Sequence, residues 1–219
     1  MRERITIFCP MSVERKAVEA CSRGRARIVQ TGIGLGPIVE AVHAAASQTD
    51  IFLLVGFAGA IRSSADPTPA IHRVIGEEDQ SEWTPSLALP DDNPATLLTL
   101  ALPACTIESK ADLANRYPEA SLIDMEASAF AQTVQTYPDR QWGVVRAVSD
   151  GPEETLPDDI ADWLTANGNT RITGVLRSLA TRRTGLGELA HLAKSTRIAS
   201  RHLAEATDRM LLHIEKGGA

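Results

Sequence analysis

The segment Ile51–Ile61, IFLLVGFAGAI, opens with the most apolar run of the chain and continues directly into glycines and other small residues. Continuous apolar residues without polar alternation are typical of a strand that is buried on both faces, as in a sheet covered by helices. Small residues after such a strand allow a ligand to approach the backbone, although a glycine turn that closes a buried strand is the more common explanation. The segment therefore predicts a central strand of an α/β fold, followed by a candidate ligand-binding loop.

Short apolar or β-branched runs alternate with helical stretches on both sides of this segment, which is the pattern of an α/β layered domain. The expected strands are Ile5–Phe8, Arg27–Thr31, Ile51–Val55, His72–Ile75, Leu97–Leu102, Ser121–Ile123 and Trp142–Val148. The expected helices in the same part of the chain are Val13–Ala20, Pro37–Ser47, Ala111–Arg116 and Glu126–Thr136. Residues 76–94 contain three prolines and no clear period, which predicts a loop.

The length of 219 residues and the hydrophobic content of 43% allow one sizeable core. We expect one domain over residues 1–169 and a helical extension over residues 170–219, with helices at Asp158–Ala166, Ile172–Ala180 and Leu186–Ile214. No apolar stretch approaches the roughly 20 residues of a membrane span or forms a signal-peptide core, so we expect a cytoplasmic protein. The three cysteines lack CxxC spacing, and no disulfide, metal or cofactor is expected.

Three further segments place polar or flexible residues where a strand ends. The glycine series TGIGLGP (Thr31–Pro37) opens a helix, where backbone N–H groups can meet a polar ligand. The junction IDMEASAF (Ile123–Phe130) carries two carboxylates, which suit either helix capping or acceptance of hydrogen bonds from the cis-diol of a ribose. The segment VRAVSDG (Val145–Gly151) ends in Asp150, which is either a catalytic group at the carboxyl end of a parallel strand or part of an Asp-Gly turn.

Taken together and in this order, the four segments resemble the purine and uridine phosphorylase superfamily, which includes the methylthioadenosine and S-adenosylhomocysteine nucleosidases. The resemblance covers residues 5–152. It implies a three-layer α/β/α nucleoside phosphorylase/hydrolase fold with a mixed central sheet, followed here by a helical C-terminal extension. It also implies an enzyme that cleaves the N-glycosidic bond of a purine nucleoside, with adenine as the released base.

The resemblance assigns roles to residues whose chemistry suits them. Asp150 is the expected general acid, because a purine leaves more easily when its N7 atom is protonated, and Ser149 is expected to orient it. Glu126 is expected to bind the ribose hydroxyls, with Met125 packing against the sugar. The small-residue loop is expected beside the base or the ribose, through Phe57, Ala58 and Gly59.

Glu14 follows the first expected strand at the position where the nucleosidases carry a glutamate that positions the attacking water. Without the resemblance, it would be an acidic residue in the first turn of a helix, favoured there by the helix dipole. The phosphate-binding Gly-Asp element of the phosphorylases is absent from this place, which favours water over phosphate. Arg15 and Arg62 lie near the pocket segments in the sequence, so a phosphate-dependent purine nucleoside phosphorylase is the main alternative. The residues that contact the base are not identified within 76–109.

The net charge of -6 is unevenly divided along the chain. Residues 171–219 contain nine basic and four acidic residues, which leaves 13 basic and 24 acidic residues for 1–170. The runs LPDDIADWL and LGELAHLAKSTRIASRHLAEA are similar to the tail of the hopanoid-associated phosphorylases, which act on the lipid-linked nucleoside adenosylhopane. A basic amphipathic tail suits peripheral contact with the inner face of a membrane. Its apolar positions suit packing on the domain or a homodimer interface equally well.

Two other function classes are weighed against this one. A dinucleotide-binding oxidoreductase is disfavoured, because the third glycine of Thr31–Pro37 arrives one residue too early for the GxGxxG fingerprint. A non-catalytic nucleoside-binding protein of the same fold would need neither a proton donor such as Asp150 nor a water-positioning residue such as Glu14. The expected partner is a purine nucleoside, and no nucleic acid is expected to bind.

Overall fold

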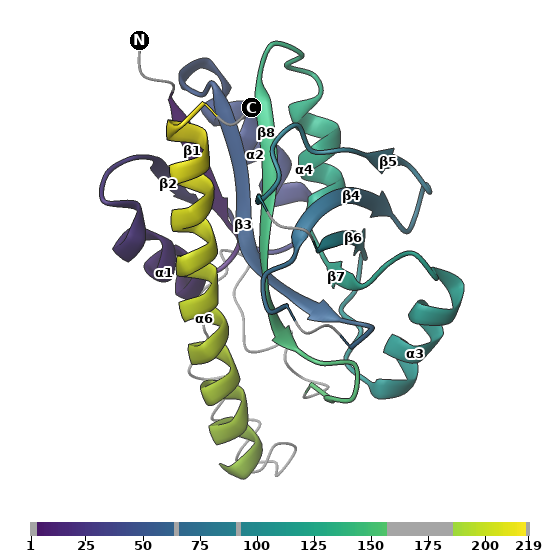
Figure 1. Ribbon diagram of the computed structural model, residues 1–219. Helices are drawn as coiled ribbons and strands as arrows, with labels where there is room; N and C mark the ends of the chain where they lie inside the picture. Colours follow the sequence, from purple (N-terminus) through teal and green to yellow (C-terminus); the bar gives the residue numbers. More distant parts are fainter. Residues whose placement is uncertain (1–3, 64–65, 91–92, 157–185, 218–219) are drawn as a thin grey trace.

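The computed structural model describes residues 4–63, 66–90, 93–156 and 186–217 (Figure 1). The helices expected at Asp158–Ala166 and Ile172–Ala180, and the domain boundary expected between residues 169 and 170, lie outside these residues. Within the described part, no helix is both long and apolar enough to cross a membrane.

The described residues form one mixed sheet flanked by helices. The strands are β1 (Ile5–Cys9), β2 (Arg27–Gln30), β3 (Ile51–Ala60), β4 (Ala70–Gly76), β5 (Glu82–Trp83), β6 (Pro94–Thr99), β7 (Leu122–Asp124) and β8 (Gln141–Asp150). The helices are α1 (Ser12–Ser22), α2 (Leu35–Ala45), the short 3-10 helix η1 (Ala46–Gln48), α3 (Ile107–Arg116), α4 (Ala127–Val134) and α6 (Leu186–Glu215). The expected α/β fold with a helical C-terminal extension is therefore confirmed.

The long strand β3 organises the sheet, which has the order β2-β1-β3-β7-β6-β4-β5, with β8 also paired to β3. One edge of β3 pairs in parallel with β1 over Ile51–Leu54 and antiparallel with β7 at Gly59 and Ala60. The other edge pairs in parallel with β8 along almost its whole length. Strand β3 therefore joins the two halves of the sheet, and its partner on one edge changes halfway along it.

Helices cover both faces of the sheet, as the continuously apolar strands predict. On one face, Phe8 and Phe52 of the strands pack against residues such as Ile38 of α2 and Phe130 of α4. On the other face, the alternate strand residues, among them Leu53, pack with residues of α1 and α6. Figure 1 shows α6 running along the sheet beside α1.

The C-terminal helix α6 is part of this second core. Its buried apolar residues recur at helical spacing and comprise Ala199, Leu203, Ala206, Met210, Leu211 and Ile214. Arg25, which follows α1, forms an ion pair with Asp208 of α6. Arg209 of α6 donates a hydrogen bond of 2.9 Å from Nη2 to Oγ1 of Thr68. The second half of the expected amphipathic helix thus buries its apolar side on the domain.

Several element boundaries differ from the sequence expectations, and the differences have local causes. Strand β6 begins at Pro94 rather than at Leu97, because proline is tolerated as the first residue of a strand. Helix α3 begins at Ile107 rather than at Ala111, since the Thr106 side chain accepts a hydrogen bond from the Ser109 backbone and caps the helix. The expected loop at residues 76–94 includes the two-residue strand β5, antiparallel to β4.

Candidate active site

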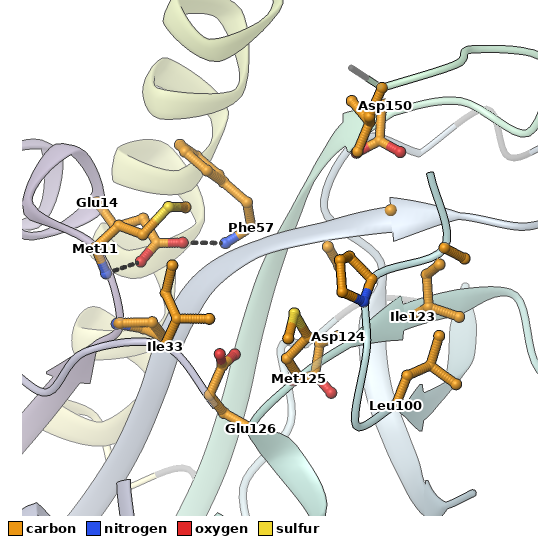
Figure 2. Close-up of a pocket in the computed structure, with 16 residues that line it drawn as sticks. Met11, Glu14, Ile33, Phe57, Leu100, Ile123, Asp124, Met125, Glu126 and Asp150 are labelled. Carbon is orange, nitrogen blue, oxygen red and sulfur yellow. Dashed lines mark hydrogen bonds between the residues drawn. The ribbon is translucent and has the colours of Figure 1, made fainter. Parts of the chain in front are cut away.

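A cavity of about 370 Å³ opens where β1, β6, β7 and β8 end, which is the edge where α/β folds place ligands (Figure 2). Its polar side chains are carboxylates from three separate elements: Glu14, Asp124, Glu126 and Asp150. The rest of the lining is largely apolar and consists of Pro10, Met11, Ile33, Phe57, Ala58, Gly59, Leu100, Pro103, Ala104, Ile123, Met125 and Leu156. In Figure 2, Glu14 and Asp150 lie on opposite sides of the view, with Met125 between them.

Glu14 is held rigidly in the first turn of α1. Its Oε2 atom accepts a hydrogen bond of 2.7 Å from the backbone N–H of Met11, and its Oε1 atom accepts one of 2.7 Å from the N–H of Phe57 in β3. The side chain is buried, and burial raises the pKa of Glu14 to about 8, against the opposing effects of Arg146 and the two N–H donors. A carboxyl group with this pKa is largely protonated at pH 7, and its ionised form is a stronger base than an ordinary carboxylate.

Glu126 stands at the junction of β7 and α4, where it is the N-cap residue of the helix. Its Oε1 atom accepts a hydrogen bond of 2.9 Å from the N–H of Gly34, in the glycine turn before α2. Gly34 has a φ of +94°, a conformation that glycine adopts without strain. Burial raises the pKa of Glu126 to about 7. The glycine series thus anchors a carboxylate of the cavity through the backbone N–H of Gly34.

Arg146 does not line the cavity, but its side chain connects two of the cavity carboxylates. The side chain is fully buried in β8, and its Nη2 atom forms ion pairs with Asp124 and, at 3.3 Å, with Glu126. The carboxylate of Asp124 also accepts hydrogen bonds of 2.7 Å from Oγ1 of Thr99 and 3.0 Å from the N–H of Ala127. One buried cation thereby balances several buried carboxylates, which would otherwise be costly to remove from water.

Asp150 ends β8 and reaches the cavity from the side opposite Glu14. Its Oδ1 atom accepts a hydrogen bond of 2.6 Å from Oγ of Ser149, and its Oδ2 atom accepts one of 2.6 Å from Nζ of Lys110. Gly59 of β3 allows this approach, because a Cβ atom there would lie 3.0 Å from Oδ2 of Asp150 and 3.2 Å from the Ile123 side chain. The carboxyl group is therefore fixed by one donor on each oxygen.

Comparison with known proteins identifies the fold. Neither a protein-family profile nor a curated protein sequence matches the chain. Among solved structures, futalosine hydrolase of Helicobacter pylori strain 26695 is similar with a TM-score of 0.67 and 14% identity, over 97% of this chain and 99% of that one. The chain has the fold of the nucleosidases.

Two nucleosidases solved with bound ligands support this assignment of the fold. The 5'-methylthioadenosine/S-adenosylhomocysteine nucleosidase from Helicobacter pylori, in complex with butyl-thio-DADMe-Immucillin-A, gives a TM-score of 0.64 at 13% identity, over 95% of this chain and 99% of that one. The enzyme of the same name from Neisseria meningitidis, with methylthio-immucillin-A, gives 0.64 at 14% identity, over 98% and 99%. The likeness extends over nearly the whole of each chain, and at these identities it is a likeness of fold.

The nucleosidase fold brings together the residues that the sequence singled out. Seven of the eight predicted site residues line the one cavity: Glu14, Phe57, Ala58, Gly59, Met125, Glu126 and Asp150. The eighth, Ser149, does not line it and contacts Asp150 from behind. The lining from residues 76–109, where the sequence identified no base-contacting residue, comes from Leu100, Pro103 and Ala104.

Two buried cations were missed by the sequence interpretation. Arg146 is signalled by its place inside the otherwise apolar run VVRAV, where a charged residue needs a buried partner. Lys110 carries no such signal, because a lysine in a short polar helix is ordinarily solvated. The two arginines named as candidates for phosphate binding are engaged elsewhere: Arg15 with Glu19 and Gln30, and Arg62 with backbone carbonyls around the end of α3.

Proposed function

We propose that this protein hydrolyses the N-glycosidic bond of a purine nucleoside and releases the base. The observation that carries the proposal is the placement of Glu14, Glu126 and Asp150 around one largely apolar cavity in a nucleosidase fold. Three carboxyl groups at separate points of the same cavity can serve three tasks: activation of water, binding of the sugar and protonation of the base.

The sugar is bound at the Glu126 end of the β7–α4 junction. A carboxylate can accept hydrogen bonds from both hydroxyls of a cis-diol, and Arg146 and the N–H of Gly34 fix its orientation. Met125, from the same junction, lies toward the middle of the cavity and supplies an apolar surface against the ribose (Figure 2). This arrangement holds the anomeric carbon between Glu14 and Asp150.

Glu14 holds the attacking water. In the proposed step the water oxygen forms a bond to C1′ while one of its protons passes to the Glu14 carboxylate. At the same time the bond from C1′ to the base breaks, and its electron pair moves onto the base. Asp150 supplies the proton that the base takes up at N7, which makes it a better leaving group.

The charge of the lining favours water over phosphate as the nucleophile. Within the described chain, no lysine or arginine lines the cavity, and Arg146 lies below it with its Nη2 atom committed to Asp124 and Glu126. A dianionic phosphate beside Glu14 and Glu126 would meet carboxylates without a cation in contact with it. A phosphate-dependent reaction is the alternative that the experiment below separates.

A lipid-linked adenine nucleoside such as adenosylhopane is the second candidate substrate. Leu102 is 77% exposed and lies directly before Pro103 and Ala104, two residues of the cavity wall. The apolar lining of the cavity, which Leu102 borders, suits a substrate with an apolar 5′ substituent. Methylthioadenosine, with a small apolar 5′ group, would use the same surface less extensively.

The test measures base release by chromatography from adenosine, methylthioadenosine and adenosylhopane, each with and without phosphate. Release that does not depend on phosphate supports the hydrolase, and release that requires phosphate identifies a phosphorylase. Asp139→Asn, at an exposed site away from the cavity, is the matched control for Asp150→Asn. No release from any of the three nucleosides, by a folded protein, would contradict the proposed function.

A further inference from the structure

Lys110 is a buried ammonium group with a complete set of acceptors. It lies on α3, its side chain is 0% exposed, and it does not line the cavity. Its Nζ atom donates to Oδ2 of Asp150 at 2.6 Å and to the backbone oxygens of Gly151 at 2.7 Å and Glu154 at 2.8 Å. An ammonium group has three hydrogens, so all its donors are used.

The charge of Lys110 is balanced by Asp150. Two of its three acceptors are neutral carbonyls, and the Asp150 carboxylate is the one charged group that the described chain places against it. A buried charge is costly unless it is paired and hydrogen-bonded. The Asp150 carboxylate is therefore the counter-charge of the buried Lys110 ammonium.

A group that protonates a leaving base must first acquire a proton, and a neighbouring cation opposes this. We propose that Lys110 is a positioning residue that sets the pH at which Asp150 takes up the proton it delivers, and fixes the plane of its carboxyl group. This inference rests on the proposed function for its catalytic meaning. Lys110 acts through Asp150, since the lysine itself does not line the cavity.

The same ammonium also binds the chain segment that follows Asp150. Its contacts with Gly151 and Glu154 hold the segment that follows β8 against α3. That segment continues to Leu156, which lines the cavity and whose N–H donates to the backbone oxygen of Cys105 at 2.8 Å. One residue thus fixes both the proton donor and the chain that closes the pocket beside it.

The test compares Lys110→Met, which removes the charge, with Lys110→Arg, which keeps it. Arg62→Met is the matched control, because Arg62 also binds backbone carbonyls around α3 but touches no cavity carboxylate. With carbon-13-labelled aspartate, the carboxyl resonance of Asp150, assigned by its loss in Asp150→Asn, is followed by NMR against pH. It should titrate about one pH unit or more higher in Lys110→Met, because an adjacent cation favours the charged carboxylate. Lys110→Arg and Arg62→Met should titrate close to the wild type.

The limb of the pH–rate profile that belongs to Asp150 should move to higher pH in Lys110→Met by the same amount. A residue with a merely structural role would lower the rate at every pH without moving that limb. An unchanged Asp150 titration in folded Lys110→Met, or an equal shift in Arg62→Met, would overturn the proposal. If Lys110→Met does not fold, the test uses the Lys110 Nζ resonance of the wild type instead. Its chemical shift must change at the pH at which the Asp150 carboxyl resonance changes, and a shift that does not change there would overturn the proposal.

The titration needs no substrate, so the two hypotheses fail separately. A wild-type protein that releases no base contradicts the proposed function, whatever the titration shows. A wild-type protein that releases base while Asp150 titrates independently of Lys110 contradicts the positioning role alone.

Discussion

Gly56 of β3 lies opposite Arg146 of β8 in the parallel register of the two strands, with no room for a side chain between them. A Cβ atom at Gly56 would overlap Nη1 of Arg146 and lie 2.8 Å from Oε1 of Glu14. The absence of a single methyl group thus leaves room for the buried Arg146 guanidinium and the Glu14 carboxylate beside the same backbone position.

We expect Gly56→Ala to destabilise the fold by about 1 to 3 kcal/mol, as overpacking of a buried site does, and to reduce activity through Glu14. Gly36→Ala is the control, because a Cβ atom at Gly36 meets nothing within 4 Å and that residue is exposed. Urea unfolding of both variants measures the difference. Equal free energies of unfolding for the two variants would show that the Arg146 side chain can move to accommodate the added methyl group.

Asp150→Asn should lose turnover by about 10² to 10⁴-fold while the nucleoside still binds, because the amide keeps the shape of the carboxyl group but has no acidic proton to give. Single-turnover experiments measure the rate of base release. Competition between the free base and the nucleoside measures how tightly the variant binds the nucleoside. Near wild-type turnover would exclude Asp150 as the proton donor. Asp139→Asn, on the exposed surface, should behave as the wild type.

Glu126→Gln should weaken ribonucleosides more than their 2′-deoxy analogues, since a hydrogen bond to a charged acceptor contributes about 1.5 to 3 kcal/mol. The ratio of kcat/KM for the two substrates, measured in wild type and variant, isolates this effect from any general loss. A ratio that does not change would leave Glu126 as a buried carboxylate whose structural role is to accept the hydrogen bond of the Gly34 N–H.

Stability should fall as the pH rises from 5 to 9. Burial raises the pKa of Glu14 to about 8 and that of Glu126 to about 7, both above the ordinary value of 4.5. The folded state then binds these protons more tightly than the unfolded state, and each group lowers the free energy of unfolding by about 1.4 kcal/mol per pH unit between its two pKa values. Urea unfolding across this range should show a shallower slope in Glu14→Gln than in wild type. The exposed Glu40→Gln should leave the slope unchanged.

The basic residues of α6 give a test of the lipid-linked substrate. Arg197 and Arg201 are exposed, and reversing both charges should weaken binding to anionic vesicles by about 1 kcal/mol per residue, less at high salt. Cleavage of soluble nucleosides should survive. Vesicle flotation measures the binding. If the wild type does not bind vesicles, or if the reversals dissociate a homodimer, the helix is structural and the lipid-linked substrate loses this support.

The sequence predicts most of the fold, because the strands are continuous apolar runs and turns separate them clearly. Sequence patterns do not predict the role of a residue when that role depends on a partner distant in the chain. Lys110 lies 40 residues from Asp150 in the chain, and its helix reads as a solvated one. Ser149, by contrast, is expected from its neighbouring position to orient Asp150, and its hydroxyl donates a hydrogen bond of 2.6 Å to that carboxyl group. Local patterns identify strand ends, whereas the contacts between those ends come from the three-dimensional packing.

Because β3 changes its neighbouring strand halfway along its length, Glu14 also has a structural role there. The register places Ile51–Leu54 opposite β1 and Gly59 and Ala60 opposite β7, and Phe57 lies in the interval between these pairings. There the Glu14 carboxylate accepts the Phe57 N–H, as a neighbouring strand would. Losing this carboxylate would leave a part-buried backbone donor without its acceptor, at a cost of up to about 1 to 3 kcal/mol. Glu14 therefore has a structural reason to be kept that is independent of catalysis, as Asp150 has through its ion pair with the buried Lys110, so neither carboxylate by itself identifies an enzyme in a related sequence.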